Sequence, residues 1–185
     1  MLRRKKDKCR FLSNRALLSL CLASLDRSEL FRPLRGGFLV QPNYTHVMDF
    51  SDSRLIKTKR LGCEAEDDLL LAWAIGATSN SNTVTLVRNG SLVASGVGQQ
   101  SRVGGCRVAI LRAEGAGHST AGCYAYSDSF FPFSDGPGTL HKAGVKGILT
   151  SSGSVNDKDT IAFCEKESLP LYMIPDAVGR GFYGH

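Results

Sequence analysis

The sequence lacks the features that define several large classes of protein. No apolar run approaches the roughly 20 residues that span a bilayer, so neither a transmembrane segment nor a membrane partner is expected. Proline is scarce, with 6 residues in 185, and 42% of the residues are hydrophobic, which excludes a collagen-like, mucin-like or wholly disordered chain. The length suits one globular domain, or a domain with a tail.

The sequence also lacks the cysteine and histidine spacing of a metal site. Zinc sites commonly place two cysteines, or a cysteine and a histidine, a few residues apart. No two of the 6 cysteines are closer than 12 residues, the 4 histidines are scattered, and the signature of zinc deaminases is missing. We therefore expect no metal, zinc included, and free thiols that are mostly small core residues.

Positive charge is concentrated at the N-terminus. Residues 1–10 hold six basic side chains and one acid, which accounts for most of the formal net charge of +6. Because the rest of the chain is nearly neutral, the net positive charge is a property of the N-terminus and not of the domain. No nucleic-acid partner is therefore expected. The apolar stretch 16–25 resembles a signal peptide, but serines interrupt it and no clear cleavage site follows, so a cytoplasmic location is predicted.

Short β-rich and helical segments alternate from residue 35 onward. The predicted strands are 36–41, 122–128, 145–151 and 169–174, and a hairpin over 83–98 turns at Asn89-Gly90. The predicted helices are 64–75, 101–115, 138–144 and 156–168, the last with Asn156 as its cap. This alternation predicts an α/β fold with three layers, α/β/α, and the hairpin makes the sheet mixed.

Three loops lie where ligands gather in such folds, at the carboxyl ends of strands. Loop 96–102 offers glycines, a helix-capping Ser101 and a guanidinium for an anion or a carbonyl oxygen, although glycines leaving a strand are common without a ligand. Loop 127–136 holds three phenylalanines and Asp135, and it is either a hydrophobic plug or a wall for a flat heterocycle. Loop 151–157 either binds a ligand or is simply a capped connection between a strand and a helix.

Several motifs occur together in one order. They are LRGGFLVQ (34–41), GVGQQSRV (96–103), SDSFFPFSDG (127–136) and SGSVND (152–157). With them, residues 32–185 resemble the C-terminal half of the AICAR transformylase portion of the bifunctional AICAR formyltransferase/IMP cyclohydrolase family. The resemblance implies a step of purine biosynthesis, formyl transfer from the co-substrate 10-formyltetrahydrofolate to AICAR. It implies a second transformylase subdomain over 31–185, cytidine deaminase-like without zinc, and a basic extension over 1–30 that does not match.

The resemblance also implies two sets of binding residues. Those that match nucleotide contacts of the family are Asn82, Arg102, Phe130 and Arg180. Those that match folate contacts are Val103, Asp135, Ser154 and Val155. The catalytic Lys-His pair of the family and its cyclohydrolase domain have no counterpart in this sequence. No catalytic residue is therefore predicted, and the isolated chain is expected to be inactive.

Two hypotheses about function remain open. The chain is a partial transformylase that works as a homodimer, as family members do, or with a partner chain that carries the missing half. Alternatively, it is a catalytically inactive paralogue or fragment that only binds nucleotide or dimerises.

Overall fold

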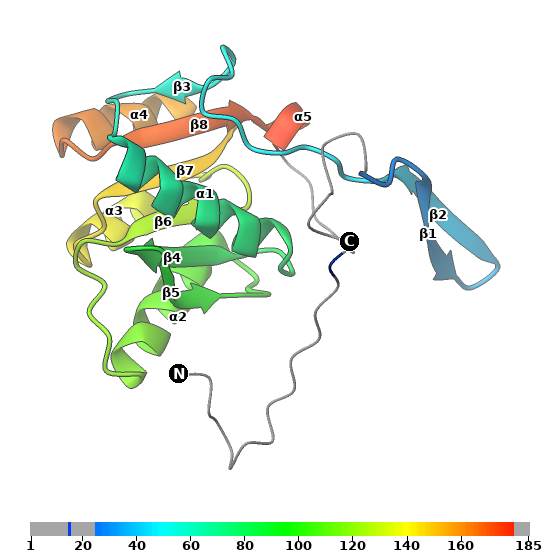
Figure 1. The fold of residues 1–185 in the computed structure, drawn as a ribbon, viewed down its shortest axis with the longest axis horizontal. Helices are drawn as coiled ribbons and strands as arrows, with labels where there is room; N and C mark the ends of the chain where they lie inside the picture. The colour runs from blue at the N-terminus through cyan, green and yellow to red at the C-terminus, as the bar shows by residue number, and fades with distance from the viewer. Residues whose placement is uncertain (1–14, 16–24, 180–185) are drawn as a thin grey trace. The chain divides into compact units, whose positions relative to one another are not determined.

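The computed structural model describes residue 15 and residues 25–179. They fall into two compact units, Met1–Thr45 and His46–His185 (Figure 1). The basic end at residues 1–10 and the predicted nucleotide contact Arg180 lie outside the described residues.

The first unit contains an antiparallel hairpin. Its strands are β1 (Glu29–Leu34) and β2 (Gly37–Pro42), and Gly36 in the turn has a φ of +86°. Strand β2 confirms the strand predicted over 36–41, whereas β1 was not predicted. Pro33 lies within β1, and proline weakens the sequence signal of a strand because it cannot donate to the ladder.

The second unit is built on a six-stranded mixed sheet with the order β3-β8-β7-β6-β4-β5. Its strands are β3 (Ile56–Lys57), β4 (Val84–Arg88), β5 (Ser91–Gly96), β6 (Tyr124–Ser127), β7 (Gly147–Ser152) and β8 (Leu171–Pro175). Strands β6, β7 and β8 are parallel, and β4 runs antiparallel to both β5 and β6. The predicted mixed sheet is confirmed.

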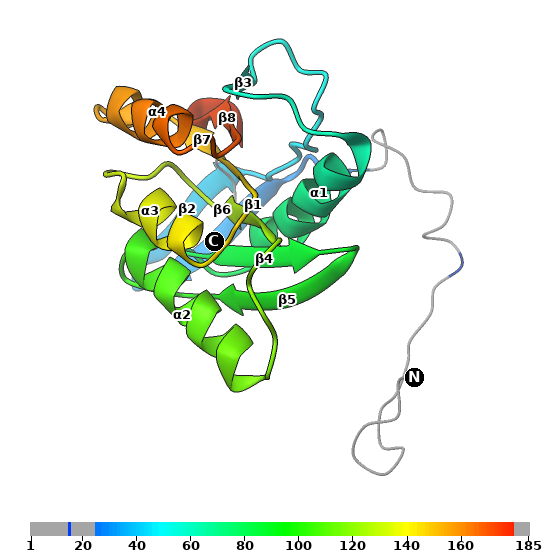
Figure 2. The ribbon, with the colours of Figure 1, turned by 90° about the vertical axis from the view of Figure 1, so that its left-hand side faces the viewer.

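Helices cover both faces of this sheet (Figure 2). Helix α1 (Cys63–Ala77) packs on one face, and the other carries α2 (Arg102–Gly115), α3 (Asp135–Lys142) and α4 (Asp157–Lys166). A short α5 (Asp176–Gly179) follows β8. Alternate strand residues such as Leu86 and Ile148 join the core beneath α2 to α4, and on the other face the buried Tyr126 lies against Gly76 of α1, so both faces of the sheet are covered.

Two local predictions hold in detail. Asn89 and Gly90 have φ values of 52° and 68°, as a type I′ hairpin turn requires. The buried carboxylate of Asp68 in α1 accepts hydrogen bonds from both turn amides, at 2.8 Å and 2.7 Å. At the start of α2, the Ser101 hydroxyl accepts from the N–H of Gly104 at 3.1 Å, which is the predicted cap.

The other two helix starts differ from the prediction. Asn156 precedes α4, but its side chain makes no cap bond and instead donates to the Pro132 carbonyl at 2.7 Å. The Asp157 carboxylate accepts from the amides of Gly153 and Ser154, at 2.7 Å and 3.2 Å. Helix α3 begins at Asp135, three residues earlier than predicted, because its first turn contains the glycines and proline that mask a helical pattern.

The described cysteines are free thiols, and three of the four are buried. Burial raises the pKa of Cys106 and of Cys164 to about 12, which leaves both thiols protonated and unreactive. They pack in the core beneath α2 to α4, as predicted for small core residues, while Cys63 is exposed. Within residues 25–179, no helix has the length and apolar character that crossing a membrane requires.

Candidate functional site

Seven of the eight predicted binding residues lie along one edge of the sheet, which we call the carboxyl edge. The parallel strands β6, β7 and β8 end there, antiparallel β4 begins there, and α2, α3 and α4 begin there. The seven residues are Asn82, Arg102, Val103, Phe130, Asp135, Ser154 and Val155. The topology therefore brings together segments that are up to about 70 residues apart in sequence, as expected for ligand loops of an α/β fold.

Arg102 is held at this edge by an ion pair with Asp128. Nη1 of Arg102 donates to Oδ1 of Asp128, whose side chain is fully buried, while the Arg102 side chain is 12% exposed. The other carboxylate oxygen of Asp128 accepts from the N–H of Thr83 at 3.0 Å. A guanidinium carries five N–H groups, so Asp128 fixes Arg102 while leaving donors for a ligand.

Asn82 is hydrogen-bonded to the glycine-rich loop that follows β5. Its backbone exchanges two hydrogen bonds with Gln99, at 3.2 Å and 3.0 Å, and its side-chain Nδ2 donates to the Gln99 carbonyl at 2.7 Å. The loop reaches Gln99 through Gly98, which has a φ of +68° that other residues rarely adopt. Among the contacts of the described residues, Oδ1 of Asn82 is the atom left to accept from a ligand.

The phenylalanine loop contains the predicted hydrophobic plug, and its role as a wall for a flat heterocycle stays a prediction. Phe131 is 1% exposed and belongs to the core, so it is the predicted plug. A side chain at Gly136 would come within 2.3 Å of the Phe131 ring, and glycine is therefore required for this packing. Phe130 is half-buried and lies beside Gly153 at the end of β7, so its ring remains at the edge where a heterocycle could pack.

A buried hydroxyl network, which no local sequence pattern predicts, joins the ends of the three parallel strands. The Ser129 carbonyl accepts from the hydroxyls of Ser127 and Thr150, at 2.9 Å and 2.8 Å. Oδ1 of Asp176 accepts from Ser129 and Ser151 hydroxyls, at 3.0 Å and 2.6 Å. This network fixes Ser129, and with it the chain between the Arg102 partner Asp128 and Phe130.

The predicted folate residues come from three segments: Val103 from the first turn of α2, Asp135 from the end of the phenylalanine loop, and Ser154 and Val155 from the turn before α4. Asp135 is exposed at the start of α3, and its Oδ1 accepts from the N–H of Gly136 at 2.8 Å. Val155 is 97% exposed in the turn before α4. The hydrogen bond from Asn156 to the Pro132 carbonyl joins that turn to the phenylalanine loop, so the two segments keep a fixed spacing.

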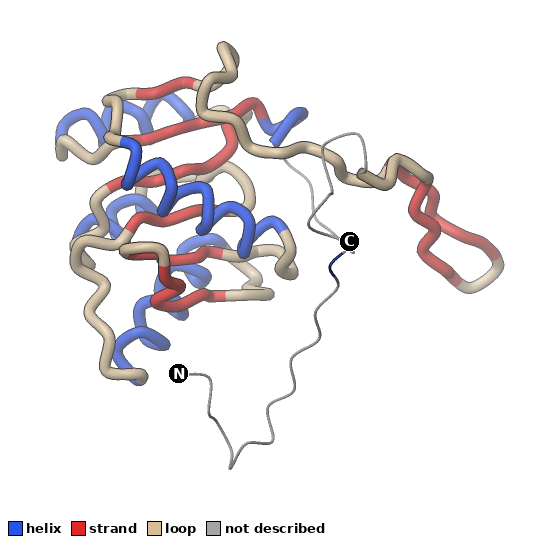
Figure 3. Tube along the Cα trace, viewed as in Figure 1, coloured by secondary structure: helices blue, strands red, loops and turns tan. Residues whose placement is uncertain are grey.

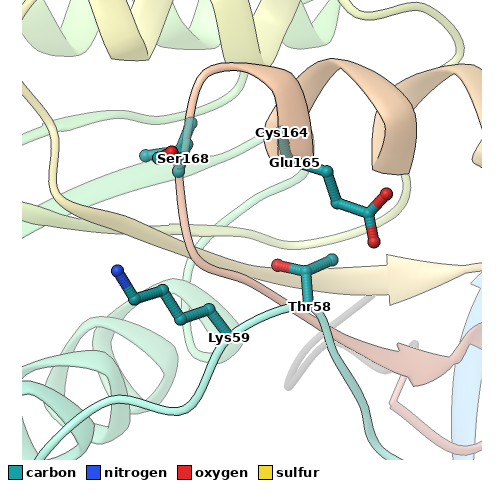
Figure 4. Close-up of a pocket in the computed structure, with 6 residues that line it drawn as sticks. Thr58, Lys59, Cys164, Glu165 and Ser168 are labelled. Atoms are coloured by element: carbon teal, nitrogen blue, oxygen red, sulfur yellow. The ribbon is translucent and has the colours of Figure 1, made fainter.

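Three cavities are lined by described residues. One of about 440 Å³ extends along α3 from Asp135. The other two lie at the opposite edge of the sheet, one of about 550 Å³ beside the start of α1 and one of about 200 Å³ between Thr58-Lys59 and the end of α4 (Figure 4). None of the seven predicted binding residues at the carboxyl edge lines either of these two cavities.

No three side chains of His, Cys, Asp and Glu gather closely enough for a metal ion in the part of the chain that the structure describes. The charged side chains at the carboxyl edge include Arg102, Asp128, Asp135, Asp157 and Asp176. The edge can therefore bind an anion or a polar heterocycle through a guanidinium, carboxylates, hydroxyls and one aromatic ring.

Comparison with known proteins shows the family of the chain. The model of the AICARFT/IMPCHase bienzyme family matches residues 1–112, more than half of the sequence. The chain belongs to this family. The resemblance drawn from the motifs is thus confirmed. The matched range includes residues 1–30, so the view of this segment as an extension unlike the family stays a prediction.

Two curated relatives show how much of the family protein is present. The bifunctional purine biosynthesis protein PurH of Trichodesmium erythraeum (strain IMS101) is 36% identical over 146 residues, which cover 79% of this chain and 27% of that protein. PurH of Brucella ovis (strain ATCC 25840 / 63/290 / NCTC 10512) is 35% identical over 150 residues, covering 77% and 28%. The chain therefore spans about a quarter of the length of the relatives it matches.

Proposed function

We propose that the chain is a partial AICAR transformylase that binds AICAR and 10-formyltetrahydrofolate at the carboxyl edge and lacks the catalytic pair. The observation that carries this proposal is the placement of Arg102 by the buried Asp128, next to Asn82. A guanidinium with a fixed orientation suits the phosphate or carboxamide oxygens of the nucleotide. Phe130 would pack against its imidazole ring.

The proposed reaction transfers a formyl group between two nitrogens. The 5-amino group of AICAR attacks the formyl carbon, the bond from that carbon to N10 of the folate breaks, and the amine must lose a proton. A general base contributes roughly 10² to 10⁴ in rate to such a step. The family uses a Lys-His pair, which has no counterpart in this sequence, so we assign the chain a binding role only.

The proposal extends to the organisation of the protein. Residues 31–185 correspond to the second transformylase subdomain, of cytidine deaminase-like fold without zinc, and residues 1–30 are an extension. A complete site would form in the cytoplasm as a homodimer, or with a partner chain that supplies the Lys-His segment. Arg180, four residues after Asp176, would complete the nucleotide contacts.

Calorimetric titration with AICAR tests the nucleotide site. We expect saturable binding by the purified chain, and at least about tenfold weaker binding by Arg102→Ala, since a charge-assisted hydrogen bond contributes about 1.5–3 kcal/mol. Arg60→Ala is the matched control, because Arg60 is exposed and lies outside the carboxyl edge. Equal affinity of the Arg102 and Arg60 variants would contradict the proposed site.

The alternative is an inactive paralogue or fragment that binds nucleotide or dimerises without any catalytic partner. The missing Lys-His pair favours it. Light scattering at high concentration measures whether the chain dimerises. A monomeric mass, together with no binding of AICAR, would mean that the chain keeps only the fold of the family.

A further inference from the structure

The hairpin of β1 and β2 has an apolar face that its own unit leaves uncovered. Its two strands lie side by side and are joined by a tight turn (Figure 3). Directly opposed residues of an antiparallel pair share a face, so the register places Phe31, Pro33, Phe38 and Val40 together. The rings of Phe31 and Phe38 meet edge-to-face at 6.4 Å, yet these residues are 62% and 66% exposed. No described residue of the first unit is buried.

A hairpin with such a face needs a further surface to pack against. Two strands alone are marginally stable in water, and three or more strands with an apolar face are needed for independent stability. Large apolar side chains that are exposed together also mark protein interfaces. Because the face itself carries no charge, the surface that covers it should be apolar as well.

Opposite charges lie at the two ends of this face. Glu29 begins β1 on the same side as Phe31, and Arg35 lies at the tip of the turn. Both are exposed, and neither joins an ion pair within the described residues. The length of the strand separates them by about 20 Å. The face therefore runs from an acidic open end to a basic turn.

We propose that this face packs against the same face of a second copy of the chain, with the two hairpins antiparallel. A two-fold axis across the hairpins brings Glu29 of each copy to Arg35 of the other, whereas parallel hairpins would place like charges together. The four strands form two layers that cover Phe31 and Phe38 of both copies. This inference rests on the homodimer of the proposed function and names its contact surface.

The size of the face sets the strength of the contact. Two phenylalanines, a valine and a proline from each copy bury less than the about 1,200 Å² of total surface at the lower end of standard interfaces. We therefore expect a reversible dimer with a Kd in the micromolar range.

Sedimentation velocity of the purified full chain, from about 1 μM to about 1 mM, brackets such a Kd. We expect wild type to dimerise and Phe38→Glu to raise the Kd at least about tenfold, because the variant buries a charge in an apolar contact. Leu111→Glu is the matched control, since Leu111 is 64% exposed on α2 of the other unit, and it should leave the Kd unchanged.

Charge reversal tests the antiparallel arrangement. Glu29→Arg and Arg35→Glu should each raise the Kd about fivefold at low salt, because each variant replaces two exposed ion pairs by two repulsive contacts. The double variant Glu29→Arg/Arg35→Glu should restore the wild-type Kd, since both pairs form again with their signs exchanged. Raising the salt concentration should shrink these differences.

Three results would overturn the proposal: a wild-type chain that stays monomeric, a dimer that Phe38→Glu leaves intact, or a double variant that dimerises no better than the single ones. Calorimetric titration with AICAR reports on the proposed function separately. AICAR binding by a chain that stays monomeric would exclude the hairpin contact and retain the nucleotide site. A dimer with the expected response to the variants and no AICAR binding would support the contact and count against the nucleotide site.

Discussion

Asp128 is the residue that positions Arg102 at the carboxyl edge. Its side chain is fully buried between the Arg102 guanidinium and the Thr83 amide. A buried carboxylate with two charged or polar partners is costly to remove, because both partners are then left unsatisfied. The same side chain therefore controls stability and the orientation of Arg102.

We expect Asp128→Ala to lower the free energy of unfolding by about 3 kcal/mol. Urea denaturation of the variant against wild type measures the change. Asp159→Ala is the control, since Asp159 is exposed in the first turn of α4. A loss no larger than that of the control would show that Asp128 and Arg102 do not form the pair in solution.

His46 gives the α/β domain a dependence on pH. Burial, and then the nearby Arg54, lower the pKa of His46 from its ordinary value of 6.5, while Asp52 partly opposes them. Below pH 6.5 the unfolded chain binds a proton that the folded protein resists, so stability present at neutral pH falls as the pH drops toward the folded pKa.

Unfolding free energies measured at pH 7.5 and pH 5.5 should therefore show a loss for wild type that His46→Gln reduces. His118→Gln, at an exposed histidine, should retain the loss. Identical pH profiles for wild type and His46→Gln would exclude His46 as the source.

At the scale of elements, the hydroxyl network links the ends of β6, β7 and β8. Ser127, Ser129, Thr150 and Ser151 are all at most 3% exposed, so their hydrogen bonds are not shared with solvent. Asp176, the residue that follows β8, accepts hydrogen bonds from two of them, Ser129 and Ser151. The network should hold the loop that carries Asp128 and Phe130 rigid before any ligand binds.

Replacing Asp176 tests this positioning role. Asp176→Ala should speed hydrogen exchange of the amides around Phe130 about 30-fold, because two hydrogen bonds of about 1 kcal/mol each are lost. Asp176→Asn should exchange nearly like wild type, since its amide oxygen can still accept from both hydroxyls. Similar exchange in the Ala variant and wild type would mean that the network does not restrain the loop, whatever the chain binds.

At the scale of the whole molecule, local features were predictable and distant pairings were not. The turn at Asn89-Gly90 and the Ser101 cap follow from side-chain and backbone chemistry within a few residues. Strand β3 has two residues and therefore no periodic pattern. Asn156 occupies the predicted cap position of α4, but its side chain bonds a carbonyl 24 residues away, so the expected cap bond is not made.

The same separation explains which site residues were missed. Asp128 pairs with Arg102 across 26 positions, and Asp176 bonds Ser129 across 47. No local sequence pattern predicts such partners, because they come together only when β6, β7 and β8 align in the sheet. Motif resemblance found the residues expected to touch ligands, whereas the residues that position them emerged only from the fold.

Turnover of AICAR tests the proposed binding role. If that role is right, the purified protein mixed with AICAR and 10-formyltetrahydrofolate should release tetrahydrofolate no faster than the uncatalysed mixture, because a general base contributes roughly 10² to 10⁴ in rate and no residue pair of this sequence matches the family's Lys-His pair. PurH of Brucella ovis serves as the active reference. Turnover that disappears in Arg102→Ala would contradict the prediction and place a base within this chain, whereas turnover that persists in that variant would come from a contaminating enzyme.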